Sequence, residues 1–149
     1  MNELEALNLA IEREKGAHRL YSKAATSSTD AKAKEMFSWL ASEEMGHLNI
    51  LEKQRDSVKG SGKWLSQEKW ASGGEISMPI DRSEFPSLSE VKGSLKTDAP
   101  ELQVLKEAID GEKESASFYA DITEATSDPN GMAMLKKLSE VERGHHLEL

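Results

Sequence analysis

The strongest constraint on this chain is an internal repeat, in which every chemically notable residue recurs 98 positions further along. Each copy contains two glutamates, a tyrosine and a histidine, namely Glu14, Tyr21, Glu44 and His47, then Glu112, Tyr119, Glu142 and His145. Six apolar or capping positions keep the same offset: Leu4 and Leu102, Leu7 and Leu105, Ile11 and Ile109, Asp30 and Asp128, Met36 and Met134, Leu40 and Leu138. Because the repeat keeps both a core pattern and ligand-type residues, with no insertion, the sequence predicts two copies of one metal-binding helical hairpin.

The composition is typical of a helical globular protein, which we expect to form a single domain over residues 1–149. Charged residues are 31% of the chain and hydrophobic residues 37%, and no apolar run approaches the roughly 18 residues that a bilayer requires. The first residues contain neither the basic region nor the apolar segment of a signal peptide. We therefore expect a cytoplasmic protein with no membrane partner.

The absence of cysteine and the acidic charge exclude several classes of function. Zero cysteines rule out disulfides, thiolate chemistry, zinc ribbons and rubredoxin-type iron sites. The formal charge of -8 argues against a nucleic-acid partner, since a phosphate backbone requires a basic face. We expect part of this negative charge to lie on carboxylates that a bound cation neutralises, and most of the rest to lie on a solvated surface.

The first hairpin, residues 3–58, is predicted to contain helices at about 3–26 and 31–58. The polar break between them offers Thr29 or Asp30 as the cap of the second helix. The two buried seams at alternating 3,4 spacing are Leu4, Leu7, Ile11, Glu14, His18 and Tyr21, then Phe37, Leu40, Glu44, His47 and Leu51. In both helices, ionisable residues therefore occupy positions that face the interior of the bundle.

The second hairpin, residues 99–149, is predicted to repeat this arrangement. Its first helix has Pro100 in the first turn and continues to about residue 125, and Ser127 or Asp128 caps its second helix ahead of Pro129. The seams are Leu102, Leu105, Ile109, Glu112, Ala116 and Tyr119, then Leu135, Leu138, Glu142, His145 and Leu149. The last helix is shorter beyond its histidine than the helix at 31–58, so we expect it to be clipped.

Residues 59–98, between the hairpins, lose the helical pattern and are predicted to form a crossover. A loop of this length needs an architectural reason, and a bundle whose second and third helices run parallel requires a connection along its length. A short helical turn is expected at 64–70. The side chains expected to hold the crossover on the bundle are Trp64, Trp70, Ile80 and Phe85. A binding role for this loop is the less favoured alternative.

Ionisable residues at the centres of all four seams indicate a metal site. A lone glutamate or histidine on a seam is more often a boundary or hydrogen-bonded core residue than a ligand. Here four glutamates and two histidines converge, and four buried carboxylates without a cation would be costly. Residues at i and i+3 share a helix face, so each Glu-x-x-His pair can bind one centre. Oxygen-rich ligands without sulfur favour iron or manganese over structural zinc.

These motifs resemble those of the rubrerythrin family, within the ferritin-like superfamily. The matching stretches are AIEREKGAHRLY with SEEMGH, and AIDGEKESASFY with SEVERGH, so the resemblance covers roughly residues 3–58 and 101–149. A glutamate from two helices and a Glu-x-x-His from the other two is the ligand set of di-iron sites in ferritin-like bundles. The resemblance implies an all-α, ferritin-like four-helix bundle of two helical hairpins joined by a long crossover.

The resemblance also implies a role for each repeated residue, with two iron ions per chain as cofactor and manganese or zinc as substitutes. The implied ligands are Glu44 and Glu142 bridging the irons, Glu14 and Glu112 as terminal carboxylates, and His47 and His145 as nitrogen ligands. Tyr21 and Tyr119 are expected to hydrogen-bond to carboxylate ligands and so to orient them. Plain core packing of both tyrosines is the alternative.

Several positions depart from the family pattern or extend it. Ser115 stands where rubrerythrins usually carry an extra glutamate that takes part in redox-linked iron movement, and Glu114 faces another way, so the chain departs from the family at one residue of its peroxidase cycle. His18, one turn after Glu14, is a candidate additional ligand, although a hydrogen-bonded or packing role is favoured. His146 follows a ligand directly and must point about 100° away from it, so we expect it at the surface.

The function implied by the resemblance is a non-haem di-iron oxidoreductase that reduces hydrogen peroxide in preference to dioxygen. Since the chain has no cysteine and therefore no rubredoxin domain, the electrons are expected from a separate donor protein. Ferritin-like iron oxidation and storage is one alternative, which needs a shell of many subunits, and a non-catalytic metal-binding module is another. A homodimer is the expected assembly, and the long crossover would permit an exchange of hairpins.

Overall fold

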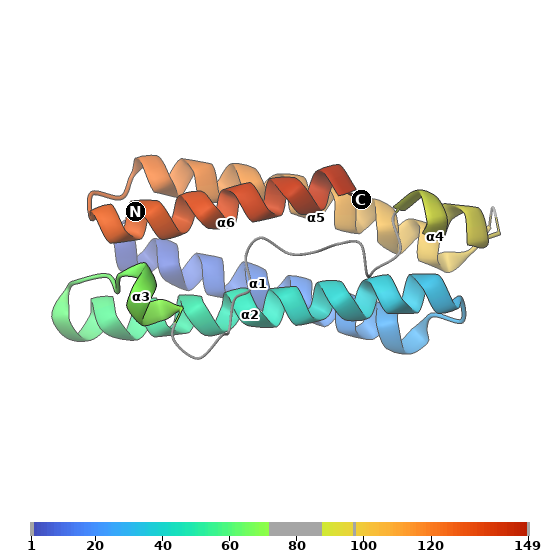
Figure 1. The fold of residues 1–149 in the computed structure, drawn as a ribbon, viewed down its shortest axis with the longest axis horizontal. Coiled ribbons are helices and arrows are strands. Elements are labelled where there is room, and N and C mark those ends of the chain that lie inside the picture. Colours follow the sequence, from blue (N-terminus) through green and yellow to red (C-terminus); the bar gives the residue numbers. More distant parts are fainter. Residues whose placement is uncertain (1, 72–87, 97, 149) are drawn as a thin grey trace.

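The computed structural model of the chain describes residues 2–71, 88–96 and 98–148, with the backbone alone for 88–89 and 145–148. Its four long helices are α1 (Glu3–Ser27), α2 (Ala31–Ser61), α5 (Pro100–Glu124) and α6 (Pro129–Glu148), and the two short ones are α3 (Gln67–Trp70) and α4 (Leu88–Ser94). Figure 1 shows α1 antiparallel to α2 and α5 antiparallel to α6, with α2 and α5 running in the same direction. The predicted all-α bundle of two hairpins joined by a crossover is confirmed.

Three of the long helices begin at a side chain that caps them. Asn2 accepts a hydrogen bond from the Glu5 amide at 2.8 Å, and Asp30 accepts one from Ala33 at 2.9 Å. Asp128 accepts one from Asn130 at 2.8 Å. Each bond satisfies an amide that has no partner within the helix. The prediction is thereby settled in favour of Asp30 over Thr29, and of Asp128 over Ser127.

The end of α2 lies further along the chain than the predicted residue 58. The helix continues through Gly60 to Ser61 and stops at Gly62, which has a φ of 75°. This left-handed conformation is accessible to glycine at little cost and is a common helix terminator. A glycine within the last turn costs only about 1 kcal/mol relative to alanine, so Gly60 weakens the helix without ending it.

The helix α4 was not predicted, because residues 59–98 were expected to contain no persistent helix beyond 64–70. Its seven residues are too few for a recognisable seam, and among its described side chains only Val91 is fully buried. The Ser94 hydroxyl donates to Asp30 Oδ2 at 2.9 Å, so α4 is fastened to the residue that caps α2. In Figure 1, α3 and α4 lie at opposite ends of the bundle, as a crossover along its length requires.

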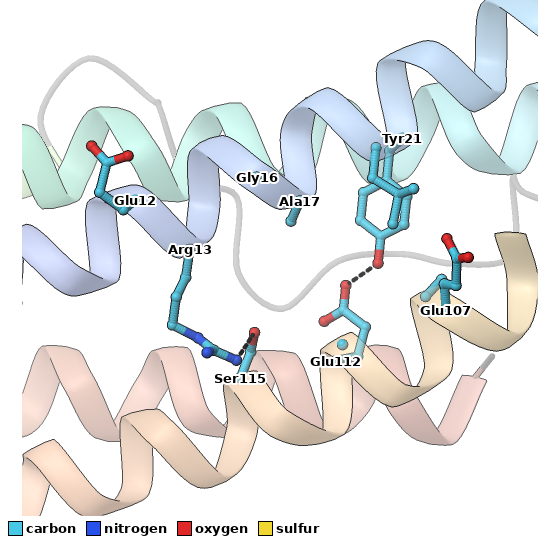
Figure 2. Close-up of a pocket in the computed structure, with 11 residues that line it drawn as sticks. Glu12, Arg13, Gly16, Ala17, Tyr21, Glu107, Glu112 and Ser115 are labelled. Atoms are coloured by element: carbon cyan, nitrogen blue, oxygen red, sulfur yellow. Dashed lines mark hydrogen bonds between the residues drawn. The ribbon is translucent and has the colours of Figure 1, made fainter.

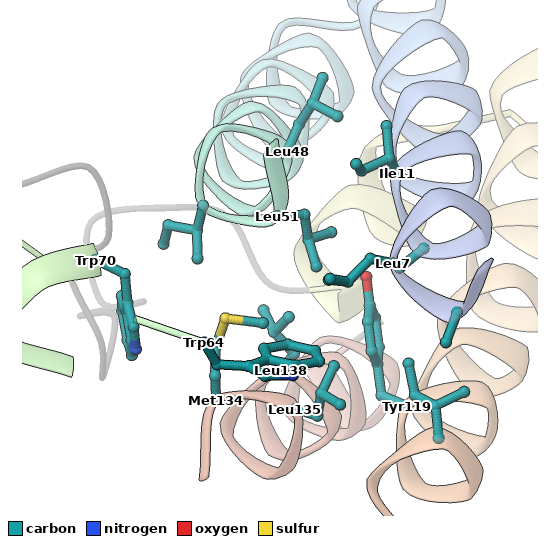
Figure 3. Packing of buried hydrophobic residues seen from close by; sticks show 14 residues of the cluster. Leu7, Ile11, Leu48, Leu51, Trp64, Trp70, Tyr119, Met134, Leu135 and Leu138 are labelled. Atoms are coloured by element: carbon teal, nitrogen blue, oxygen red, sulfur yellow. The ribbon is translucent and has the colours of Figure 1, made fainter. Parts of the chain in front are cut away.

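Two apolar clusters fill the bundle on either side of its middle. One contains Leu7, Leu51, Leu138 and Tyr119 (Figure 3), and the other contains Tyr21, Phe37, Leu40 and Leu105. Along α1, α2 and α5, the glutamate of the repeat falls between residues of one cluster and residues of the other, and on α6 Glu142 follows residues of the first cluster. The ionisable seam residues therefore occupy the middle of the bundle, with apolar packing above and below.

The crossover is held to the bundle by two tryptophans and a glutamine. Trp64 and Trp70 are 4% and 3% exposed and belong to the first apolar cluster, which confirms their predicted anchoring role. Gln54 of α2 is fully buried; it donates to the Leu65 carbonyl at 3.0 Å and accepts from the Leu65 amide at 2.6 Å. The other two predicted anchors, Ile80 and Phe85, lie outside the described residues.

A search of the described residues finds no helix of sufficient length and apolar character to cross a membrane.

Candidate metal centre

Three helices bring four ionisable side chains together in the middle of the bundle. Glu14 comes from α1, Glu44 and His47 from α2, and Glu142 from α6, and one ligand atom of each lies within 4.8 Å of the others. All four residues are 2% exposed or less. The i, i+3 spacing of Glu44 and His47 puts both on the inward face of α2, as the sequence predicts.

His47 is the cation of this group. Its Nδ1 lies 3.2 Å from Glu142 Oε1, 3.6 Å from Glu14 Oε1 and 3.7 Å from Glu44 Oε2. Burial lowers the pKa of His47, but the carboxylates of Glu14 and Glu142 outweigh burial and raise that pKa well above its usual value. In the absence of a metal ion, the protonated imidazole of His47 therefore supplies positive charge to the carboxylates around it.

Glu112 of α5 completes the set of four carboxylates. It is 2% exposed, and it is close enough to Glu142 to act on its titration. Burial raises the pKa of Glu142 well above the usual value, and the neighbouring carboxylates of Glu112 and Glu14 raise it further. All four carboxylates thus meet in the interior, where one of them keeps its proton because repulsion makes full ionisation too costly.

Two tyrosines bind the terminal glutamates across the bundle. The Tyr21 hydroxyl of α1 donates to Glu112 Oε1 of α5 at 2.7 Å (Figure 2), and the Tyr119 hydroxyl of α5 donates to Glu14 Oε1 of α1 at 2.5 Å. Both predicted hydrogen bonds to carboxylates are present, and each tyrosine serves the glutamate of the other hairpin. Burial, followed by the nearby carboxylates, raises the pKa of both tyrosines well above 10, so the hydroxyls remain protonated donors.

Two carboxylate oxygens of the cluster fit a bound cation. Glu14 Oε2 and Glu44 Oε1 are buried and accept no hydrogen bond from the described residues. A buried acceptor without a donor is costly, and coordination to a metal ion would remove that cost. Carboxylates together with imidazole and no sulfur suit iron or manganese. The donor set therefore matches the cofactor that the sequence indicates.

The remaining predicted site residues lie as follows. His145 is on α6, three residues after Glu142, but its side chain and that of His146 lie outside the described ones. His18 turns to the neighbouring helix: its Nδ1 is 3.0 Å from the Ala41 carbonyl, and its Nε2 is 3.4 Å from Ser22 Oγ. Both ring nitrogens thus have partners within the bundle, and neither partner is a proposed metal ligand.

Arg13 is a residue near the centre that the sequence did not single out. Its guanidinium lies 5.0 Å from the centre of the Phe118 ring, and its Nη2 donates to Ser115 Oγ at 3.4 Å. Arginine next to the seam residue Glu14 looks like an ordinary surface residue in the sequence. The signal that could have indicated otherwise is the set of small residues opposite one another on the two helices: Gly16, Ala17, Ala108 and Gly111.

Comparison with known proteins gives one match. A family model described as Rubrerythrin matches residues 5–149. Comparisons with curated proteins and with solved structures found no match. The matched range includes all four long helices except the first two residues of α1, and every residue of the centre.

Proposed function

The chain belongs to the rubrerythrin family, and on this basis we propose that it is a non-haem di-iron oxidoreductase that reduces hydrogen peroxide with electrons from a separate donor protein. The observation that supports the proposal most directly is the buried group of Glu14, Glu44, His47 and Glu142, whose ligand atoms lie within 4.8 Å of one another. Two divalent ions would neutralise the four carboxylates of this centre, which the protein otherwise balances with retained protons.

In the proposed site, the repeat supplies equivalent ligands to two ions. The assignments are Glu44 and Glu142 as bridging carboxylates, Glu14 and Glu112 as terminal carboxylates, and His47 and His145 as nitrogen ligands. When bound, two ferrous ions supply two electrons and the positive charge that stabilises the oxygen anions formed as the O–O bond breaks. Reduction of hydrogen peroxide to two water molecules consumes those two electrons and two protons.

The protein's own residues keep the ligands in place. The Tyr21 and Tyr119 hydroxyls each fix one oxygen of a terminal carboxylate and so restrict the orientation of that carboxylate. Such outer hydrogen bonds typically change metal affinity or activity 10- to 100-fold. The two apolar clusters on either side lower the local dielectric and strengthen the electrostatic interactions within the site.

The electron donor is proposed to be a separate protein, because the 149 residues contain no cysteine with which to build a rubredoxin-type iron site. We also propose that the protein acts in the cytoplasm as a homodimer. Size-exclusion chromatography with light scattering tests the dimer, and a large hollow assembly would instead favour ferritin-like storage.

The proposed reaction is tested by loading the protein with ferrous iron without oxygen and mixing it in a stopped-flow instrument with hydrogen peroxide or with dioxygen. We expect two irons per chain and much faster oxidation by peroxide. The variant Glu14→Gln should lose this reactivity, whereas Glu35→Gln, a control on the exposed face of α2, should retain it. Faster oxidation by dioxygen, continuing beyond two irons per chain, would favour iron handling, and no oxidation by either would favour a non-catalytic metal-binding module.

A further inference from the structure

A cavity of about 240 Å³ opens between α1 and α5 beside the carboxylate centre. Its walls include Arg13, Gly16 and Tyr21 from α1, and Gly111, Glu112 and Ser115 from α5. Figure 2 shows two hydrogen bonds that cross it, from Tyr21 to Glu112 at one end and from Arg13 to Ser115 at the other. A water needs only about 10–15 Å³ of such space, so the cavity accommodates molecules of several heavy atoms.

Glycines on both helices keep this cavity open. A Cβ added at Gly111 would meet no atom within 4 Å, and one added at Gly16 would meet only Arg19 Nη2, at 4.0 Å. Helix interfaces in protein cores are normally close-packed, but here a residue without a side chain lines the cavity on each helix. The glycines therefore leave space that larger side chains would fill.

The cavity leads to the proposed metal centre through Glu112. This residue is in the cavity wall, it is 2% exposed, and it is one of the proposed terminal ligands of the centre. The other members of the cluster are 2% exposed or less. A small molecule in the cavity would thus meet the centre at the Glu112 carboxylate, which Tyr21 holds at one oxygen.

Arg13 places a cationic side chain in the wall of this cavity. Its Nε is buried and has no hydrogen-bond partner in the part of the chain that the structure describes. No carboxylate among the described residues pairs with its guanidinium, which contacts the Phe118 ring and the Ser115 hydroxyl. A buried, unsatisfied cationic donor favours a solute that is neutral or negative and accepts hydrogen bonds.

We propose that this cavity is the route by which small hydrogen-bond acceptors, such as hydrogen peroxide or azide, reach the metal centre, and that Arg13 attracts and positions them. The inference rests on the proposed di-iron site but not on the identity of the oxidant. It makes Gly111 and Gly16 the residues that set the width of the route, and Arg13 a positioning residue on its wall.

The test measures azide binding to the oxidised, iron-loaded protein by stopped-flow absorbance. Leucine at position 111 projects into the cavity, so Gly111→Leu should reduce the azide association and dissociation rate constants together by at least tenfold, with Kd changed less than twofold. Gly16→Leu fills the same space from the opposite wall and should act alike. Gly60→Leu, on the exposed end of α2 where an added Cβ also meets nothing, is the matched control and should bind azide at the wild-type rate.

Arg13→Gln tests the positioning role in the same experiment. It should reduce azide association several-fold and weaken its dependence on salt concentration, because the attraction is electrostatic, and Arg13→Lys should restore part of the rate. Iron content and the melting temperature of each variant show whether the site and fold are intact. Unchanged azide association in both leucine variants that fold and hold iron would overturn the proposed route.

The outcome is distinguishable from failure of the proposed function. If the wild-type protein is oxidised by dioxygen and not by peroxide, the peroxidase proposal is wrong, yet the azide rates of the leucine variants still decide on the route. If the wild-type protein binds two irons but azide never reaches them, the route is overturned while the di-iron site stands.

Discussion

At the scale of single residues, the centre is connected by hydrogen bonds that cross between the hairpins. Tyr21 and Tyr119 lie in opposite apolar clusters, and each donates to the glutamate of the other hairpin. The spacing within one helix predicts which face a tyrosine occupies, but it carries no information about which neighbouring helix that face meets. The sequence therefore indicated the hydrogen bonds and could not assign the partners.

Removal of either tyrosine hydroxyl should weaken the site. Tyr21→Phe and Tyr119→Phe each leave one buried carboxylate oxygen without its donor, which should lower the free energy of unfolding of the metal-free protein by about 1–2 kcal/mol. Metal affinity should fall about 10- to 100-fold. Urea denaturation with a chelator and cobalt titration measure the two effects. Because the two bonds are equivalent by position, an effect in only one of the variants would contradict this account.

The metal-free protein should lose stability as the pH rises from 5 to 7. Glu142 and His47 both have a raised pKa in the folded state, so the folded protein retains protons that the unfolded chain releases above about 4.5 and 6.5. Stability then falls with rising pH, by up to about 1.4 kcal/mol per pH unit for each retained proton. The variant Glu142→Gln has no carboxyl proton at this position. It also removes one of the carboxylates that raise the pKa of His47, so the imidazole holds its proton less strongly.

Urea denaturation of both proteins in the presence of a chelator at pH 5, 6 and 7 measures this difference. We expect the free energy of unfolding of Glu142→Gln, relative to that of the wild type, to increase from pH 5 to pH 6 and again from pH 6 to pH 7. A constant difference across the three values would show that Glu142 is ionised in the folded state at pH 5, contrary to the direction of its pKa.

At the scale of elements, helix starts were more predictable than helix ends. Asp30 and Asp128 cap their helices through their own side chains, a local interaction that the sequence displays. The end of α2 depends on which of two nearby glycines adopts the left-handed conformation, and it is Gly62. The helix α4 depends on the burial of Val91 against the bundle, a tertiary contact that seven residues cannot reveal.

The contact between the crossover and α6 requires glycine at position 131. A Cβ there would lie 2.6 and 2.7 Å from Cδ2 and Cε2 of the buried Trp64 ring. Trp64 cannot easily move, since its Nε1 donates to Glu3 and its amide to Asp128. Gly131→Ala should therefore lower the free energy of unfolding by roughly 1–3 kcal/mol, as measured by urea denaturation.

Gly60→Ala is the matched control, because Gly60 is also helical and an added Cβ meets no atom there. Alanine is the better helix former, so this variant should be unchanged or more stable by up to about 1 kcal/mol. Similar losses in both variants would mean that Trp64 does not restrict position 131.

At the scale of the whole molecule, the internal repeat predicted a bundle of two helical hairpins. Buried seams at 3,4 spacing predicted four long helices, and the length of residues 59–98 predicted that α2 and α5 run parallel. The cavity between α1 and α5 was not predicted, because it depends on how glycines of two distant segments face each other. Spacing along one chain thus predicted the ligand faces, while the space between helices became evident only in three dimensions.

The central claim is that the two hairpins together hold two metal ions. Its most direct test is an anaerobic titration with ferrous iron that counts the ions bound tightly per chain. We predict two for the wild type and for Glu35→Gln, an exposed position on α2. We predict no more than one for Glu44→Ala and for Glu142→Ala, since each of these variants removes a proposed bridging carboxylate. Two tightly bound irons in both alanine variants, or none in the wild type, would contradict the claim.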